Sequence, residues 1–117
     1  MPLARTAERR SELRYDVALS AEILVDGYLY EGLTRNLSFS GVNVILDDDL
    51  PEGIQVQLTL FLTQDGIEDP STAPFELTGT VMWTAPTEEG AWALGIRFGT
   101  LTGLQWETLA NFLQQLA

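Results

Sequence analysis

The sequence predicts a small, mainly β protein: a six-stranded antiparallel barrel with a flexible N-terminal arm and a C-terminal helix. Apolar and polar residues alternate in six short stretches up to about residue 98, and turn-forming residues separate them. From about residue 102 to 116 the apolar residues change to helical spacing. A sandwich is the alternative, and a barrel is favoured because it leaves fewer edges exposed on such apolar strands.

Residues 1–15 form the predicted arm, ahead of a folded domain over 16–117. The arm is polar and shows no apolar periodicity. Its side chains four positions apart carry like charges, as in Arg10 and Arg14, and such pairs oppose an isolated helix. We therefore expect an extended or loop conformation for the arm.

The six strands follow in order. The first runs from about Val17 to Val25 and ends at a turn, Asp26-Gly27, from which the second returns over Tyr28 to Leu37. The apolar residues of the other four lie within 42–46, 54–62, 75–83 and 92–98. Pro51-Glu52-Gly53 predicts a turn, and the acidic segment 64–74 predicts a loop.

The C-terminal helix carries a start signal. Thr102 and Gln105 have the spacing of a capping box, and Leu101 and Trp106 that of a hydrophobic staple. The apolar face of the helix comprises Trp106, Leu109, Leu113 and Leu116, with Phe112 beside them. We expect this face to cover an open end of the barrel, and docking of a partner protein is the alternative.

The composition favours a binding module over an enzyme. Cys and His are absent, which excludes disulfides, thiolate metal sites and a histidine general base. We expect no catalytic residues, no metal site and no cofactor. Asp47 to Asp49 lack the spacing of a calcium loop and are interpreted as a solvated end of a strand. No apolar run approaches the length of a membrane span and no signal peptide is evident, so we expect a cytoplasmic protein.

The charge distribution suggests an anionic ligand. Acidic residues number 17 against 6 basic ones, giving a net charge of −11, and such a surface repels DNA, RNA and anionic membranes. Every basic residue is an arginine, and most of them lie in the arm. Arginine grips phosphates and guanine edges through its planar fork, so the arm is a candidate binding element.

Two motifs refine this hypothesis. The arm contains Arg9 followed by Arg10 and Arg14 in an RxxxR spacing, and the second strand ends in an NxSxxG spacing over residues 36–41. Because strand side chains alternate, Asn36 and Ser38 are expected to face outward if the residue between them faces inward.

Gly41, the last residue of the second motif, permits either a turn with positive φ or close approach of a base to the backbone.

In this order, and together with the six-stranded pattern, the two motifs resemble the PilZ domain, which binds the bacterial second messenger cyclic di-GMP. The resemblance covers the whole chain and includes Gly95 to Phe98 before the terminal helix. It implies a split-barrel fold and a ligand-binding set comprising Arg9, Arg10, Arg14, Asn36, Ser38 and Gly41.

Within that set, the resemblance implies that Arg10 and Arg14 bind phosphate and guanine, and that the NxSxxG residues bind the other base. A basic residue at the position of Arg9 tends to accompany a stacked pair of ligand molecules. Arg97 is interpreted as a strand residue paired with a nearby acid, and the alternative is a group that supports the residues in contact with the ligand. Whether Arg35, Trp83, Trp92 or Arg97 reach the ligand stays open.

We therefore predict a single-domain cyclic di-GMP receptor that orders its arm on binding the nucleotide and signals to a separate protein. The resemblance suggests a partner from motility, pilus or exopolysaccharide machinery. The alternative is a ligand-independent protein–protein adaptor on a PilZ-like scaffold. An enzyme would have to work with carboxylates alone, and no spaced Asp/Glu pair suggests one.

Overall fold

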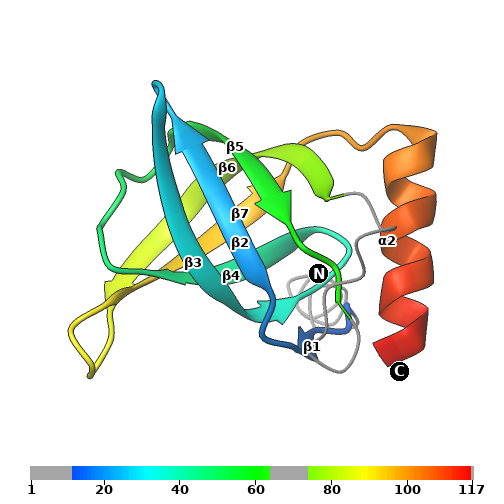
Figure 1. The fold of residues 1–117 in the computed structure, drawn as a ribbon, viewed down its shortest axis with the longest axis horizontal. Helices are drawn as coiled ribbons and strands as arrows, with labels where there is room; N and C mark the ends of the chain where they lie inside the picture. The colour runs from blue at the N-terminus through cyan, green and yellow to red at the C-terminus, as the bar shows by residue number, and fades with distance from the viewer. Residues whose placement is uncertain (1–11, 64–73, 117) are drawn as a thin grey trace, which may run out of the picture.

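The computed structural model describes residues 12–63 and 74–116. Within these residues a single sheet is followed by one helix (Figure 1). The elements are β1 (Tyr15–Asp16), β2 (Ser20–Val25), β3 (Tyr28–Leu37), β4 (Gly41–Leu46), β5 (Gln55–Leu60), β6 (Phe75–Pro86), β7 (Trp92–Phe98) and α2 (Gly103–Leu116). Most of the predicted arm, including Arg9 and Arg10, lies outside the described residues, as does most of the predicted acidic loop.

The sheet closes on itself as a barrel. The strand order is β1-β3-β2-β5-β6-β7-β4, and β3 also pairs with β4. Every pairing is antiparallel. The six-stranded antiparallel barrel predicted from the sequence is therefore confirmed. The short strand β1 is an addition that the alternation pattern did not predict, and it pairs with the end of β3.

The first turn forms as its sequence predicts. Asp26 and Gly27 both have positive φ, 50° and 83°, and they connect β2 to β3. Two successive residues in this region match the right-handed twist of the flanking strands, which is why short hairpins favour Asp-Gly.

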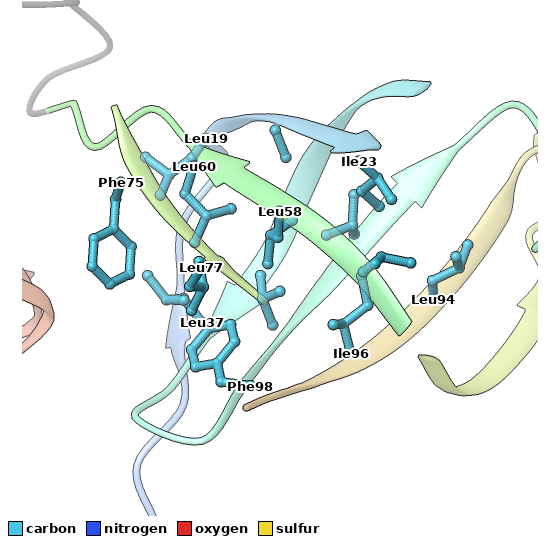
Figure 2. Packing of buried hydrophobic residues seen from close by; sticks show 14 of the residues in the cluster. Leu19, Ile23, Leu37, Leu58, Leu60, Phe75, Leu77, Leu94, Ile96 and Phe98 are labelled. Carbon is cyan, nitrogen blue, oxygen red and sulfur yellow. The ribbon is translucent and has the colours of Figure 1, made fainter. Parts of the chain in front are cut away.

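Alternate residues of each strand fill the barrel. On β2, for example, Ala21 and Ile23 are buried while Leu24 is exposed. Figure 2 shows leucine and isoleucine side chains from facing strands meeting inside, with Phe75 and Phe98 toward one end. The barrel is filled by side chains, so a ligand site has to lie on its outer surface or at a rim.

Helix α2 packs on the barrel as expected. Leu109, Phe112 and Leu113 are buried and belong to the same core cluster as the strands. Figure 1 shows α2 standing beside one end of the barrel. In the part of the chain that the structure describes, no helix is long and apolar enough to cross a bilayer.

The predicted capping box is present at the start of α2. The Thr102 amide donates to Oε1 of Gln105 at 2.9 Å, and the Gln105 amide donates to Oγ1 of Thr102 at 3.1 Å. The Gln105 side-chain amide also donates to the carbonyl of Glu76 at 2.8 Å, which ties the start of the helix to β6.

Trp106 departs from the prediction that it lies on the buried face of α2. Its side chain is 56% exposed, and its ring stacks on Phe39 with centroids 5.5 Å apart and planes at 25°. The buried face is centred on Leu109 and Leu113, one turn and two turns further along. Phe39 belongs to the turn between β3 and β4, so this contact joins that turn to the helix.

Candidate functional site

Two β-bulges shape one outer face of the barrel. The β3–β4 register shifts between Thr34 and Asn36, and the β6–β7 register shifts between Val81 and Trp83. Thr34 and Val81 are buried, whereas Asn36 is half-buried and Trp83 is 43% exposed. The extra residue in each bulge therefore turns the next side chain toward the outside, and bulges are frequent beside binding sites for this reason.

The strand pairing places four residues in one row across this face. Asn36 pairs with Asn43, Asn43 pairs with Gly95, and Gly95 pairs with Trp83. Residues directly opposite in antiparallel strands have their β-carbons only about 5 Å apart. Two amides, a glycine and an indole thus follow one another over β3, β4, β7 and β6.

Gly95 gives the indole its place in this row. A β-carbon at this position would come within 2.0 Å of Nε1 of Trp83. The absence of a side chain therefore lets the Trp83 ring lie over the β7 backbone.

We expect Gly95→Ala to destabilise the protein by about 1–3 kcal/mol, because the new methyl group must displace the Trp83 ring. The penalty should largely disappear when the same change is made in a Trp83→Ala background. Thermal unfolding of the two single variants and the double variant measures this coupling. Equal penalties in both backgrounds would show that the ring is not the obstacle.

A pocket of about 450 Å³ opens on this face, within the range usual for small-molecule sites. It is lined by Arg14, Asn36, Ser40, Gly41, Val42, Asn43, Met82, Trp83, Gly95, Ile96 and Arg97. The lining holds two arginines and no acidic residue, in a chain of net charge −11. A second pocket, over β2, β3, β5 and β6, is lined by Glu22 and Glu76 and by no arginine. Of these two pockets, the first is therefore the better suited to an anion.

Arg14 and Glu12 fix the end of the arm against this pocket. A guanidinium nitrogen of Arg14 donates to Oδ1 of Asn36 at 2.9 Å. Oε1 of Glu12 accepts from the Ser40 amide at 2.9 Å and from the Ser40 hydroxyl at 2.6 Å. One member of the RxxxR motif thus lies on the NxSxxG segment, as the binding hypothesis requires.

Ser38 does not face outward, contrary to our expectation. It is fully buried, and its hydroxyl accepts from the amides of Ser40 at 3.3 Å and Gly41 at 3.2 Å. Leu37 is buried too, because the alternation of β3 stops where the turn begins. Ser38 holds the shape of the turn, and its neighbour Ser40 lines the pocket.

Gly41 does not have a positive φ, so the turn geometry is not the reason for a glycine here. Among the described glycines, positive φ occurs at Gly27, Gly53 and Gly90. A β-carbon at Gly41 would come within 2.4 Å of the backbone carbonyl oxygen of Ile96. Glycine is therefore required for the close approach of β4 to β7. The same close approach leaves the backbone of Gly41 lining the pocket.

The pKa of Glu12 is lowered. Burial raises it, but hydrogen bonds from Ser40 and Ser38 and the charge of Arg14 outweigh that effect. A lowered pKa in the folded state means that the contact stabilises the attached arm above the ordinary pKa of glutamate and is lost as pH falls through the lowered value.

We therefore expect the Ser40 amide resonance to move on acidification, with a midpoint below the usual pKa of glutamate. A pH titration followed by nuclear magnetic resonance measures this midpoint. The transition should be absent from a Glu12→Gln variant. A midpoint above the usual value would contradict the assignment.

Of the remaining candidate residues, Arg97 and Trp83 line the pocket. Within residues 12–63 and 74–116, Arg97 has no acidic partner, contrary to our expectation. Trp92 packs against the core, and Arg35 is exposed at the β3 bulge without lining the pocket. Asp47 to Asp49 are exposed, and the described residues contain no group of acidic side chains placed to hold a metal ion.

Asn43 is the pocket residue that the sequence analysis missed. It lies between Val42 and Val44 in a strand that is otherwise apolar. The sequence contained one indication of its role: an amide side chain between apolar residues of a strand needs a hydrogen-bond partner, and a ligand can supply one.

Solved structures share this barrel. The chain matches the PilZ domain of YcgR from Escherichia coli with c-di-GMP at 17% identity and a TM-score of 0.68, covering 92% of this chain and 91% of that one. It matches the inhibitor of motility MotI/DgrA from Bacillus subtilis at 19% identity and a TM-score of 0.72, covering 92% of this chain and 49% of that one.

A third match is the PlzA protein of Borreliella burgdorferi in complex with c-di-GMP, at 16% identity and a TM-score of 0.62. It covers 98% of this chain and 59% of PlzA, so the chain spans about half the length of MotI/DgrA and of PlzA. Curated protein sequences gave no significant match. The sequence profile of the PilZ domain matches residues 8–115, nearly the whole length, and the chain therefore belongs to the PilZ domain family.

Proposed function

We propose that this chain is a cyclic di-GMP receptor that binds the nucleotide in the pocket over β3, β4, β7 and β6 without catalysing a reaction. The observation that carries the proposal is the pocket lining: two arginines and no acid in a strongly acidic chain. A dinucleotide with two phosphates and two guanines needs cations, hydrogen-bonding groups and a flat surface, and this lining offers all three.

Arg14 and Arg97 supply positive charge for the phosphates. The Asn36 amide and the Ser40 hydroxyl offer hydrogen bonds to a guanine, and the half-exposed indole of Trp83 offers a stacking face. Gly41 allows the base to approach the backbone, and Ser38 contributes by holding the turn. Arg9 and Arg10, from the sequence motif, complete the proposed set from the arm.

The proposed response to the ligand is ordering of the arm. Glu12 and Arg14 already bind the NxSxxG segment through Ser40 and Asn36. The closed arm then presents a new surface to a separate protein in the cytoplasm. MotI/DgrA is an inhibitor of motility, which supports a partner from motility machinery, while pilus and exopolysaccharide machinery are further candidates.

Isothermal titration calorimetry with cyclic di-GMP, GMP and cyclic AMP tests the proposed function. We expect cyclic di-GMP to bind with a Kd on the order of micromolar or tighter, and the two mononucleotides to bind far more weakly. Affinity should fall as salt rises, because the contacts are charge-assisted. Equal affinities for the three nucleotides, or none for any, would overturn the proposal.

Exposed apolar side chains favour one second candidate, a ligand-independent protein–protein adaptor. Leu24 and Leu29 face each other across the β2–β3 hairpin and are 38% and 54% exposed, and Leu33 on β3 is 54% exposed. Exposed apolar patches of this kind often mark protein contacts. A flat calorimetric trace with cyclic di-GMP, together with retained capture of a partner, would favour this function.

A further inference from the structure

Asn43 carries an unsatisfied hydrogen-bond acceptor. Its side chain is 8% exposed, and Oδ1 is the buried side-chain atom, among those of the described residues, that has no hydrogen-bond partner. A buried polar atom without a partner is destabilising, and native proteins contain few of them. Such an atom at a ligand pocket suggests that the ligand supplies the missing donor.

The position of Asn43 supports this interpretation. Val42 and Val44, its neighbours on β4, belong to the core, so alternation turns Asn43 toward the outer face, where it lines the pocket. It lies in the row between Asn36 and Gly95. Oδ1 of Asn36 already accepts from Arg14, whereas the corresponding oxygen of Asn43 is unoccupied.

Oδ1 of Asn43 is a hydrogen-bond acceptor, so only a donor group of the ligand can bind it. Ionised phosphates and ribose ring oxygens offer no proton. The ribose 2′-hydroxyls do offer one, but they are identical in cyclic di-GMP and cyclic di-AMP and so cannot distinguish the two nucleotides. Guanine offers two adjacent donors on its Watson–Crick edge, N1–H and the 2-amino group, whereas adenine has neither and carries its amino donor at C6 instead. A site built to hydrogen-bond a donor rejects an analogue that lacks it, because the acceptor is then left unpaired.

We propose that Asn43 accepts a hydrogen bond from the Watson–Crick edge of a bound guanine and thereby makes the pocket prefer guanine to adenine. The proposal rests on the proposed function. Access runs past Trp83, whose half-exposed indole covers Gly95, the neighbour of Asn43 in the row. A base that pushes the indole aside and stacks on it would lie over Gly95, beside the Asn43 amide.

The test compares two ligands in three proteins by calorimetry. Cyclic di-GMP and cyclic di-AMP are titrated into the unaltered protein, into Asn43→Leu, and into Asn111→Leu. The last variant makes the same substitution on the exposed side of α2, outside the pocket lining. We expect the preference for cyclic di-GMP to fall about tenfold in Asn43→Leu, the size of one hydrogen bond to a buried acceptor, and to stay unchanged in Asn111→Leu.

Thermal unfolding of the same proteins without ligand separates recognition from folding. Asn43→Leu should be no less stable than the unaltered protein, because it removes an unpaired buried oxygen. Asn43→Val, smaller and well suited to a strand, is the replacement if leucine disturbs the barrel. An unchanged preference for cyclic di-GMP in a folded Asn43 variant would overturn this inference while leaving the receptor function intact. Absence of cyclic di-GMP binding to the unaltered protein would instead overturn the receptor function and this inference with it.

Discussion

Arg14→Ala is expected to weaken cyclic di-GMP binding by about 1.5–3 kcal/mol, the cost of losing a hydrogen bond to a charged group. Arg14 lines the pocket, and its guanidinium group already donates to Asn36 at 2.9 Å. The change therefore removes a cation from the site and releases the end of the arm. Calorimetry at fixed ionic strength measures the loss, because affinity also depends on salt.

Arg35→Ala is the matched control. Arg35 carries the same charge and lies next to Asn36 in sequence, but it is exposed at the β3 bulge and does not line the pocket. Its replacement alters the net charge by the same amount and should change affinity only slightly. Equal losses in the two variants would mean that general attraction, and not the pocket, accounts for binding.

Gly41→Ala is expected to destabilise the fold by about 1–3 kcal/mol or more. The added methyl group would meet the carbonyl oxygen of Ile96, a backbone atom that cannot rotate away, at 2.4 Å. The strands β4 and β7 would have to separate at one edge of the pocket, so ligand affinity should fall as well. Chemical denaturation measures the free energy of unfolding directly.

Gly103→Ala controls for the loss of glycine flexibility. A β-carbon at Gly103 meets no atom within 4 Å, and the residue starts α2, where alanine is acceptable. Its stability should match or slightly exceed that of the unaltered protein. A Gly41→Ala variant as stable as Gly103→Ala would contradict the close approach of β4 to β7.

The barrel was predictable because its strands obey simple alternation. Ile23 and Leu58, for instance, point inward from positions that the period-two pattern assigns to the core. The capping box at Thr102 was equally accessible, since it depends on two residues three positions apart. Both patterns depend only on residues close together in sequence, so they can be recognised without knowing which strands pair.

The outer face was less predictable because it depends on irregularities. Alternation would turn Ser38 outward, but the strand ends at Leu37 and the serine turns into the protein. The bulge before Trp83 shifts its register, and the sequence does not show which partner a bulged strand will face. The row formed with Asn43 and Gly95 exists only after four strands have paired, so no stretch of sequence contains it.

The stack of Phe39 on Trp106 has a practical consequence. Phe39 lies between Ser38 and Ser40, so a nucleotide that shifts this turn also changes the surroundings of the Trp106 ring. Indole emission responds to such changes, and a Trp106→Phe variant would identify the contribution of this ring among the three tryptophans. If nucleotide binding shifts this turn, the emission of Trp106 is expected to report occupancy in real time, without labelling.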